Sequence, residues 1–416
     1  MNSEKPYICG VDMVSPLGVD PDEQWNNAWA GRSGIGPLTR FPLRDGFPVT
    51  ISGEVPDFDS SPYPFLRPRC MAHWSSPIFK HGLLVAYRAL KKAGIEITPE
   101  IANRTAVTFS TAIGGLDAVV EADRKMEATG KLPHPFVNPN SCVNMVAGKV
   151  SILTGATGPT ATTVTACATG NTSVIIGSLF IRNNSADVAI CGAVDFPLVK
   201  PIVAGFAAMK GAYTTKKSAE PEPPEHASRP FSMGRRGFVV SEGAACIVLA
   251  SERFVKTWGL KPRFQVAGWA TNSDAHHYVA PNLDTVTACM KEAVADASIT
   301  PDDIHSINAH AASTKIGDQV EAEAIKRVFR GRIPPITANK SLIGHAMGAS
   351  SAIETVLAVE GMQRDSLLPT INHNPDPALD LESVVSEPIR LEQEHVLHNA
   401  FGFGGCNACL VLRRLR

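Results

Sequence analysis

Runs of β-branched and apolar residues alternate with helix-like segments along the chain. Residues Thr162–Thr165 are all β-branched and predict a buried strand. Small and polar residues follow at 168–171, which suits a tight turn, and Ser173–Ile181 is apolar on nearly every face, as in a buried helix. This pattern places Cys167 where a strand ends and a helix begins.

The same order of elements occurs twice in the sequence. Residues 81–115 and 284–314 each contain an amphipathic helix, an Ile-Thr-Pro turn and a short β-rich run. The strand, turn and helix around Cys167 have a similar counterpart in residues 336–362. These repeats predict an α/β fold of two duplicated βαβαβ halves, with mostly parallel sheets covered by helices. A seam near residues 252–261 divides the chain into halves 1–255 and 256–416.

Composition narrows the class of protein. The chain of 416 residues has 39 Lys and Arg against 40 Asp and Glu, which argues against nucleic acid or an anionic membrane as the main partner. Nine scattered Cys, no signal-peptide pattern and no apolar run long enough to span a membrane predict a soluble, cytoplasmic protein with reduced thiols. Cys406 and Cys409 form a C-x-x-C without a second pair, so strand alternation explains them and no metal site is expected.

Cys167 is the first candidate for chemistry. A thiol at the N-terminus of a helix faces unpaired backbone N–H groups and the positive end of the helix dipole, so we expect a lowered pKa and a reactive thiolate. The alternative from this position alone is a small buried Cys that only packs.

The second half supplies polar partners. His310 ends the strand-like residues 305–310, and Lys340 and His345 precede a small-residue helix that carries Glu354. A lone His at a strand end is more often structural, but ligands in α/β sheets gather at the carboxyl ends of strands. Together with Cys167 these side chains predict a crevice that stabilises developing negative charge.

Several motifs, in order, resemble those of one known family. They are GVDMVSPLG, FVNPNSCVNMVAGKV, GPTATTVTACATGNTSV, ADVAICGAVD, SRPFSMGRRGFVVSEGAA, NSDAHH, NAHAASTKIGDQVEAEAI, NKSLIGHAMGASSAIE, LPTIN and NAFGFGGCN. Over almost the whole chain, the sequence resembles the elongating β-ketoacyl-acyl-carrier-protein synthases of the type II kind, in the thiolase superfamily. The resemblance implies a thiolase-like fold with layered α-β-α-β-α architecture. A Cys-His-His set separates such enzymes from thiolases, which use a second Cys, and from initiating synthases, which use Cys-His-Asn.

The resemblance implies a role for each catalytic residue. Cys167 would accept an acyl group from the phosphopantetheine of a carrier protein, with the backbone N–H groups of Cys167 and Phe401 as the oxyanion hole. His310 and His345 would donate hydrogen bonds to the thioester oxygen while malonyl-carrier loses carbon dioxide, and the carbanion would attack the acyl group. Lys340 would lie behind the histidines.

The resemblance also suggests supporting residues. Glu354 would pair with Lys340 and fix its position. Phe401 resembles the gatekeeper between the acyl pocket and the malonyl site, although its Gly-rich run could be only a tight turn. Thr314 remains from a pair of threonines that bind pantetheine. Apart from the resemblance, the spacing of Asp318 and Glu321 predicts a capping box that opens the next helix, a structural role.

Two sets of residues would contact the acyl chain and the carrier. We expect Ile113, Cys142 and Phe206 to line the acyl pocket. Lys210, Arg67 and Arg69 are candidates for docking an acidic carrier protein, with a solvated surface role as the alternative for each.

The sequence departs from the family pattern at several positions. Ala311 and Ala312 replace a Gly-Thr, and 278–280 lacks a pantetheine-binding Thr. We therefore expect a specialised synthase, of a polyketide or polyene pathway, as an alternative to fatty-acid synthesis. We expect no bound cofactor, an acyl carrier protein as partner, and a homodimer or a heterodimer with a paralogous chain-length factor. The alternative function is a non-catalytic chain-length-factor-like subunit, which would lack the nucleophile.

Overall fold

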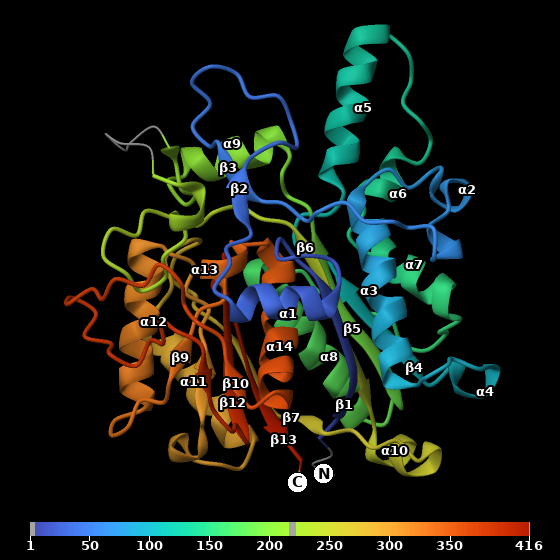
Figure 1. Ribbon diagram of the computed structural model, residues 1–416. Helices are drawn as coiled ribbons and strands as arrows, with labels where there is room; N and C mark the ends of the chain where they lie inside the picture. The colour runs from blue at the N-terminus through green and yellow to red at the C-terminus, as the bar shows by residue number, and fades with distance from the viewer. Residues whose placement is uncertain (1–4, 216–221, 416) are drawn as a thin grey trace.

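The computed structural model describes residues 5–215 and 222–415 and contains a nine-stranded mixed sheet (Figure 1). In spatial order its strands are β4 (Thr105–Ser110), β5 (Val188–Asp195), β6 (Gly243–Ala250), β1 (Tyr7–Val14), β7 (Phe264–Ser273), β13 (Cys406–Arg414), β12 (His395–Gly402), β8 (Ser306–Asn308) and β9 (Ile336–Thr337).

The strand pairing repeats in the two halves. In the first half β1 and β6 are antiparallel, as are β6 and β5, while β5 and β4 are parallel. In the second half β7, β13, β12 and β8 pair in the same order and directions. Among the described residues, β1 and β7 pair through Tyr7–Gln265 and Ile8–Phe264. The fold is therefore duplicated, as the repeats predicted.

The predicted halves can be compared with the structure in their strand direction and in their boundary. The expectation of mostly parallel sheets is wrong. β13 follows β12 through a short turn and pairs with it in the antiparallel direction, and β6 is also antiparallel to β5. The predicted division between residues 255 and 256 falls within α10 (Glu252–Trp258) and stays a prediction.

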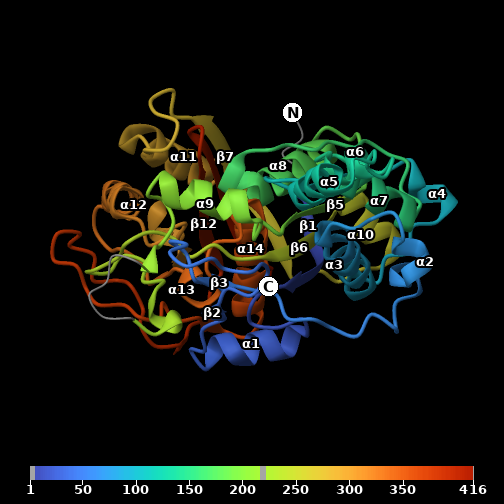
Figure 2. The same cartoon turned by 90° about the horizontal axis from the view of Figure 1, so that it is seen from above.

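Helices and strands stack in five layers. On one outer face α3 (Pro77–Ala93) packs on β1 and β6, and α7 (Met145–Thr154) packs on α3 and β4. The central layer is α8 (Thr169–Arg182) and α14 (Met347–Gln363), which contact each other and strands of both halves. On the other outer face α11 (Leu283–Asp296) packs on β7 and β13, with α12 (Lys315–Val328) beside it. Figure 2 shows both halves from above, with α14 between them. This is the α-β-α-β-α arrangement.

The remaining elements surround this core, and α5 stands out from the body in Figure 1. They are α1 (Pro21–Trp29), β2 (Ile35–Pro37), β3 (Ile51–Gly53), α2 (Pro68–Met71), α4 (Pro99–Ala102), α5 (Leu116–Thr129), α6 (Val137–Ser141), α9 (Lys200–Ala208), α13 (Lys340–Ile343), β10 (Ser366–Leu367) and β11 (Ile389–Arg390). No helix within the described ranges is both long and apolar enough to cross a bilayer.

The segments beside the nucleophile agree with the prediction only in part. The buried helix predicted for Ser173–Ile181 is present as α8. The buried strand predicted for Thr162–Thr165 is wrong: Thr160 makes an isolated bridge to Val107, and the residues after it leave the sheet. Val164 is 46% exposed, so β-branched character here marks an extended segment at the surface.

Candidate active site

Cys167 lies in a single 3-10 turn, Ala166–Ala168, directly before α8. Ala166 has φ of 48°, a left-handed conformation that costs an alanine about 1–2 kcal/mol. Thr169 stabilises the turn, because its Oγ1 accepts the Thr165 N–H and donates to the Ala166 carbonyl. The turn holds the Cys167 side chain at the start of the helix in a buried site.

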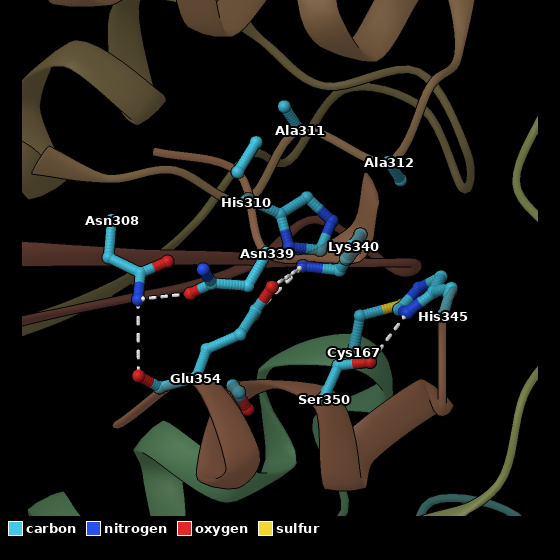
Figure 3. Close-up of polar contacts among 12 residues, drawn as sticks. Cys167, Asn308, His310, Ala311, Ala312, Asn339, Lys340, His345, Ser350 and Glu354 are labelled. Atoms are coloured by element: carbon cyan, nitrogen blue, oxygen red, sulfur yellow. Dashed lines mark hydrogen bonds and ion pairs between the residues drawn. The ribbon is translucent and has the colours of Figure 1, made fainter. Parts of the chain in front are cut away.

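His345 lies next to the thiol, in the connection between α13 and α14. Its Nε2 is 3.0 Å from the Sγ of Cys167, and its Nδ1 is 3.0 Å from the Oγ of Ser350 (Figure 3). The backbone is also fixed, since the His345 N–H donates to Val239 and its carbonyl accepts from Ser241. The ring is therefore held against the nucleophile from both sides.

His310 completes a group of three. It follows β8, and one of its ring nitrogens, one from His345 and the Sγ of Cys167 all lie within 4.8 Å of one another. The ring planes of His310 and His345 are close to perpendicular, with centroids 5.7 Å apart. Cys167 belongs to the first duplicated half, whereas His310 and His345 belong to the second, 143 and 178 positions further along the chain. The fold brings all three into one small site.

Lys340 and Glu354 form a buried ion pair behind this group. The Lys340 Nζ lies 2.8 Å from both carboxylate oxygens of Glu354, and the side chains are 1% and 0% exposed. Burial raises the pKa of Glu354 to about 7, and the positive charge of Lys340 opposes that rise. Asn308 supports the pair by donating to the Glu354 carbonyl and to the side-chain oxygen of Asn339. The pair places a fixed ammonium beside the two imidazoles.

Both imidazoles are neutral near pH 7. Burial lowers the pKa of His310 well below its ordinary value, and the charge of Lys340 lowers it further. The same two causes lower the pKa of His345. A neutral imidazole carries one N–H and one acceptor nitrogen, so each ring can donate one hydrogen bond to an oxygen that gains negative charge.

The thiol does not have the lowered pKa that the helix position predicted. Burial raises the pKa of Cys167 to about 11, while Lys340 and a backbone hydrogen bond from Phe403 act in the opposite direction. Removal of the sulfur from water outweighs the helix dipole in this enclosed site. Cys167 is therefore a protonated thiol at neutral pH, and it needs an adjacent base to react.

The raised pKa predicts how alkylation of Cys167 depends on pH. The folded pKa lies above the ordinary thiol value, so the thiolate fraction should rise about tenfold per pH unit. Iodoacetamide labelling, followed by peptide mapping, should show a Cys167 rate that climbs through about pH 9 without levelling. Peptide mapping separates this signal from the exposed Cys70 and Cys142. A plateau near neutral pH would contradict a protonated resting thiol.

Asp318 and Glu321 have a different task from the predicted capping box. Helix α12 begins at Lys315, so both carboxylates lie inside it rather than at its start. Glu321 accepts the backbone N–H groups of His310 (2.9 Å) and Ala311 (2.7 Å). Asp318 accepts those of Ala312 and Thr314 at 3.1 Å. The two side chains hold the loop that carries His310.

Phe403, rather than Phe401, places its amide at Cys167 and its ring against the predicted pocket residues. Phe401 pairs with Asn407 in the β12–β13 ladder, and its ring lies 5.8 Å from that of His310 in the core of the second half. The backbone N–H that reaches Cys167 is that of Phe403. The Phe403 ring also packs against the cluster that contains Ile113 and Phe206. The strand continues to Gly402, so Phe403 rather than Phe401 lies beside the thiol. The oxyanion-hole and gatekeeper roles stay predictions.

Two of the three predicted pocket residues lie together. Ile113 and Phe206 are half-buried against one apolar cluster, which also contains Met347. Cys142 is exposed at the end of α6, and its role in an acyl pocket stays a prediction. Thr314 is half-buried directly before α12, and its contact with pantetheine also stays a prediction.

The docking candidates are exposed but do not form one patch within a single chain. Arg67 directly precedes α2 and Arg69 lies within it, whereas Lys210 follows α9 with φ of 61°. Helix α2 lies at the right-hand edge of the molecule in Figures 1 and 2, well apart from α9.

Sequence reasoning missed Asp195, at the end of β5. This fully buried carboxylate accepts the backbone N–H groups of Ala112, Ile113 and Ala349, and the Thr111 hydroxyl. It ties the pocket segment to the start of α14. A charged residue ending an otherwise apolar strand was the signal that could have identified it. Ser350 was missed as well, since a small residue in a small-residue helix carries no such signal.

Comparisons with known proteins agree with this geometry. The N-terminal domain model of the β-ketoacyl synthases matches residues 5–254, and their C-terminal domain model matches residues 263–374. A 3-oxoacyl-[acyl-carrier-protein] synthase 2 of Coxiella burnetii is 35% identical, with 100% of both chains covered.

Solved structures give the same result. One is a type II polyketide synthase acyl-carrier protein in complex with its ketosynthase bound to the hexaketide, with a TM-score of 0.88, 28% identity, and 99% of this chain and 100% of that chain covered. The ishigamide ketosynthase/chain length factor has a TM-score of 0.89 and 28% identity over 99% of this chain and 100% of that chain. With its duplicated five-layer fold, its buried Cys-His-His group and family models that match most of its length, this chain belongs to the β-ketoacyl synthase family.

Proposed function

We propose that this chain catalyses the decarboxylative Claisen condensation of malonyl-acyl-carrier protein with an acyl group held on Cys167, giving a β-ketoacyl-carrier. The observation that carries the proposal is the enclosed group of one thiol and two neutral imidazoles, with a fixed ammonium behind them. Such a group offers a nucleophile and two donors for a developing oxyanion in one water-poor site. The family membership and the named relatives support the same reaction.

The first half-reaction loads the acyl group. The Cys167 sulfur attacks the thioester carbonyl of the acyl-carrier, and its proton passes to the Nε2 of His345, 3.0 Å away. The backbone N–H groups of Cys167 and Phe403, which lie at the sulfur, are the donors available to the oxygen that becomes negative. The bond between the acyl carbon and the pantetheine sulfur then breaks, and the departing sulfur takes the proton from His345.

The second half-reaction forms the carbon–carbon bond. Malonyl-carrier loses carbon dioxide, and the electron pair of the broken C–C bond moves toward the thioester oxygen as an enolate. His310 and His345 each donate an N–H to that oxygen. Burial, reinforced by the charge of Lys340, lowers the pKa of both rings and keeps them neutral at working pH. The enolate carbon attacks the acyl-Cys167 carbonyl, and the Cys167 sulfur leaves as a thiolate that takes a proton from water to restore the resting thiol.

Replacing either histidine should suppress decarboxylation. His310→Ala or His345→Ala removes one preorganised donor, and loss of one such donor typically costs about 10²–10³ in rate. Carbon dioxide release from malonyl-carrier measures this step. His398→Ala is the matched control, because the ring of this buried histidine lies between the carbonyls of Ser351 (3.0 Å) and Asn308 (3.4 Å) and is not part of the group at the thiol. Undiminished release in both His310→Ala and His345→Ala would refute their assigned role.

The alternative function, a non-catalytic chain-length-factor-like subunit, has no support from the site. Such a subunit lacks the nucleophile, whereas here the nucleophile, both histidines and the ion pair are assembled. We propose that substrates arrive on the phosphopantetheine of an acyl carrier protein and that the chain holds no further cofactor. Both fatty-acid and polyketide pathways fit the relatives.

We further propose that the chain forms a dimer, either with itself or with a paralogous chain-length factor. Exposed apolar side chains favour an interface: Val164, three residues before Cys167, is 46% exposed, and Ile152 on α7 is 78% exposed. Because one similar structure is a ketosynthase/chain length factor, a heterodimer is as well supported as a homodimer. A cytoplasmic location is proposed from the reduced cysteines.

A further inference from the structure

The two catalytic histidines differ in what supports their far nitrogens. The Nδ1 of His310 is buried and has no hydrogen-bond partner among the described residues. The Nδ1 of His345 faces the Oγ of Ser350 at 3.0 Å (Figure 3). Ser350 is itself fully buried in the first turns of α14. Only His345 therefore has a neighbour that can set its tautomer.

The Ser350 hydroxyl retains both a donor and an acceptor for this ring. Its oxygen accepts the backbone N–H of Ala346 at 2.8 Å, which uses one lone pair. One lone pair and the hydroxyl proton remain, because a hydroxyl has one donor and two acceptor sites. The hydroxyl can thus accept from a protonated Nδ1 or donate to a bare one.

The proposed reaction needs His345 in both of these states. During acyl transfer its Nε2 must be a bare acceptor for the Cys167 proton, so Nδ1 carries the hydrogen. During decarboxylation Nε2 must carry the hydrogen and donate it to the thioester oxygen, so Nδ1 is bare. A backbone amide in place of the hydroxyl would stabilise only the second state, and a carbonyl only the first.

We propose that Ser350 is a positioning residue that supports both tautomers of His345, turning its hydroxyl between the two half-reactions. The inference rests on the proposed function and adds a group that acts through His345 without touching substrate. No bond forms or breaks at Ser350. Its hydroxyl only exchanges the direction of one hydrogen bond. The ring itself exchanges protons with water once the free carrier has left the site: Nδ1 releases its proton and Nε2 takes one up.

Variants of two adjacent serines test the role. Ser350→Ala should slow both acyl transfer to Cys167 and malonyl decarboxylation by about three- to tenfold, the range set by one net hydrogen bond. Ser350→Thr keeps the hydroxyl and should restore most of both rates. Ser351→Ala is the matched control, because Ser351 is equally buried but bonds to Asn171 and Gly348. It should leave both rates near those of the wild type.

The two rates distinguish the role from a merely structural one. Acyl transfer is followed by intact mass and decarboxylation by carbon dioxide release, each across a pH series. Unchanged rates in Ser350→Ala would overturn the proposal, as would a loss confined to one half-reaction, or an equal loss in Ser351→Ala. The proposed function is tested by whether the wild type carries out acyl transfer and decarboxylation at all. The role of Ser350 is tested by the ratio of each variant rate to the wild-type rate.

A measurement on the unaltered enzyme keeps the test independent of whether any variant folds. With histidine labelled by ¹⁵N, the ring signals of His345 are assigned by their loss in His345→Gln. The free enzyme should show the Nδ1–H tautomer. After acylation of Cys167 without malonyl-carrier, the signals should change to the Nε2–H tautomer. The same tautomer in both states would overturn the proposal.

Discussion

Cys167→Ala should abolish condensation, with a loss of about 10⁴-fold or more, since removal of a covalent nucleophile leaves no alternative route. No other thiol among the described residues shares the site: the three-residue group contains Cys167 alone of the nine cysteines. The measurement is β-ketoacyl-carrier formation from acyl-carrier and malonyl-carrier. Residual activity within about tenfold of the wild type would show that the acyl group is not held on the Cys167 thiol during the reaction.

Cys167→Gln separates the two half-reactions in the same experiment. It removes the nucleophile but places an amide where the acyl thioester would lie, so His310 and His345 can still bind malonyl-carrier. This variant should lose condensation and retain carbon dioxide release. Loss of both activities with an intact fold would mean that decarboxylation needs the sulfur itself.

Glu354→Gln should destabilise the protein by about 3–5 kcal/mol, because it leaves the ammonium of Lys340 buried without a counter-charge. The pair lies at 2.8 Å with almost no exposure, so water cannot replace the lost carboxylate. Denaturant unfolding measures the change. The double variant Lys340→Met with Glu354→Gln should recover most of the loss, since no unpaired charge remains.

A surface pair provides the control for this prediction. Glu121 and Lys125 are 57% and 70% exposed and lie one helical turn apart in α5. Glu121→Gln should change stability by less than about 0.5 kcal/mol. Equal effects from Glu354→Gln and Glu121→Gln would contradict the view that Lys340 depends on a buried partner.

The sequence predicted the parts of the site that local patterns determine. The apolar run of 173–181 placed Cys167 at a helix start, and the repeated segments placed His310, Lys340 and His345 at matching strand ends in the other half. Pairing of Lys340 with Glu354 followed from the family resemblance and is present at 2.8 Å. These features depend on neighbours along the chain or on the order of motifs.

Features that depend on the three-dimensional surroundings were predicted poorly. The helix dipole suggested a lowered pKa for Cys167, but burial by segments from both halves raises it. Thr162–Thr165 looked like a core strand, because β-branched composition cannot distinguish a buried strand from an exposed edge. Asp318 had the spacing of a capping box, yet α12 starts three residues earlier, and its carboxylate holds the loop after His310 instead. Each of these outcomes was decided by contacts between residues far apart in sequence.

The central claim is that an acyl group becomes attached to the buried Cys167 sulfur. Incubation with an acyl-carrier alone, followed by intact mass and peptide mapping, tests it most directly. We predict one acyl adduct per chain, on the peptide that contains Cys167, which disappears when malonyl-carrier is added. An unmodified Cys167, or an adduct on an exposed cysteine instead, would contradict the account and favour a subunit that binds the chain without reacting.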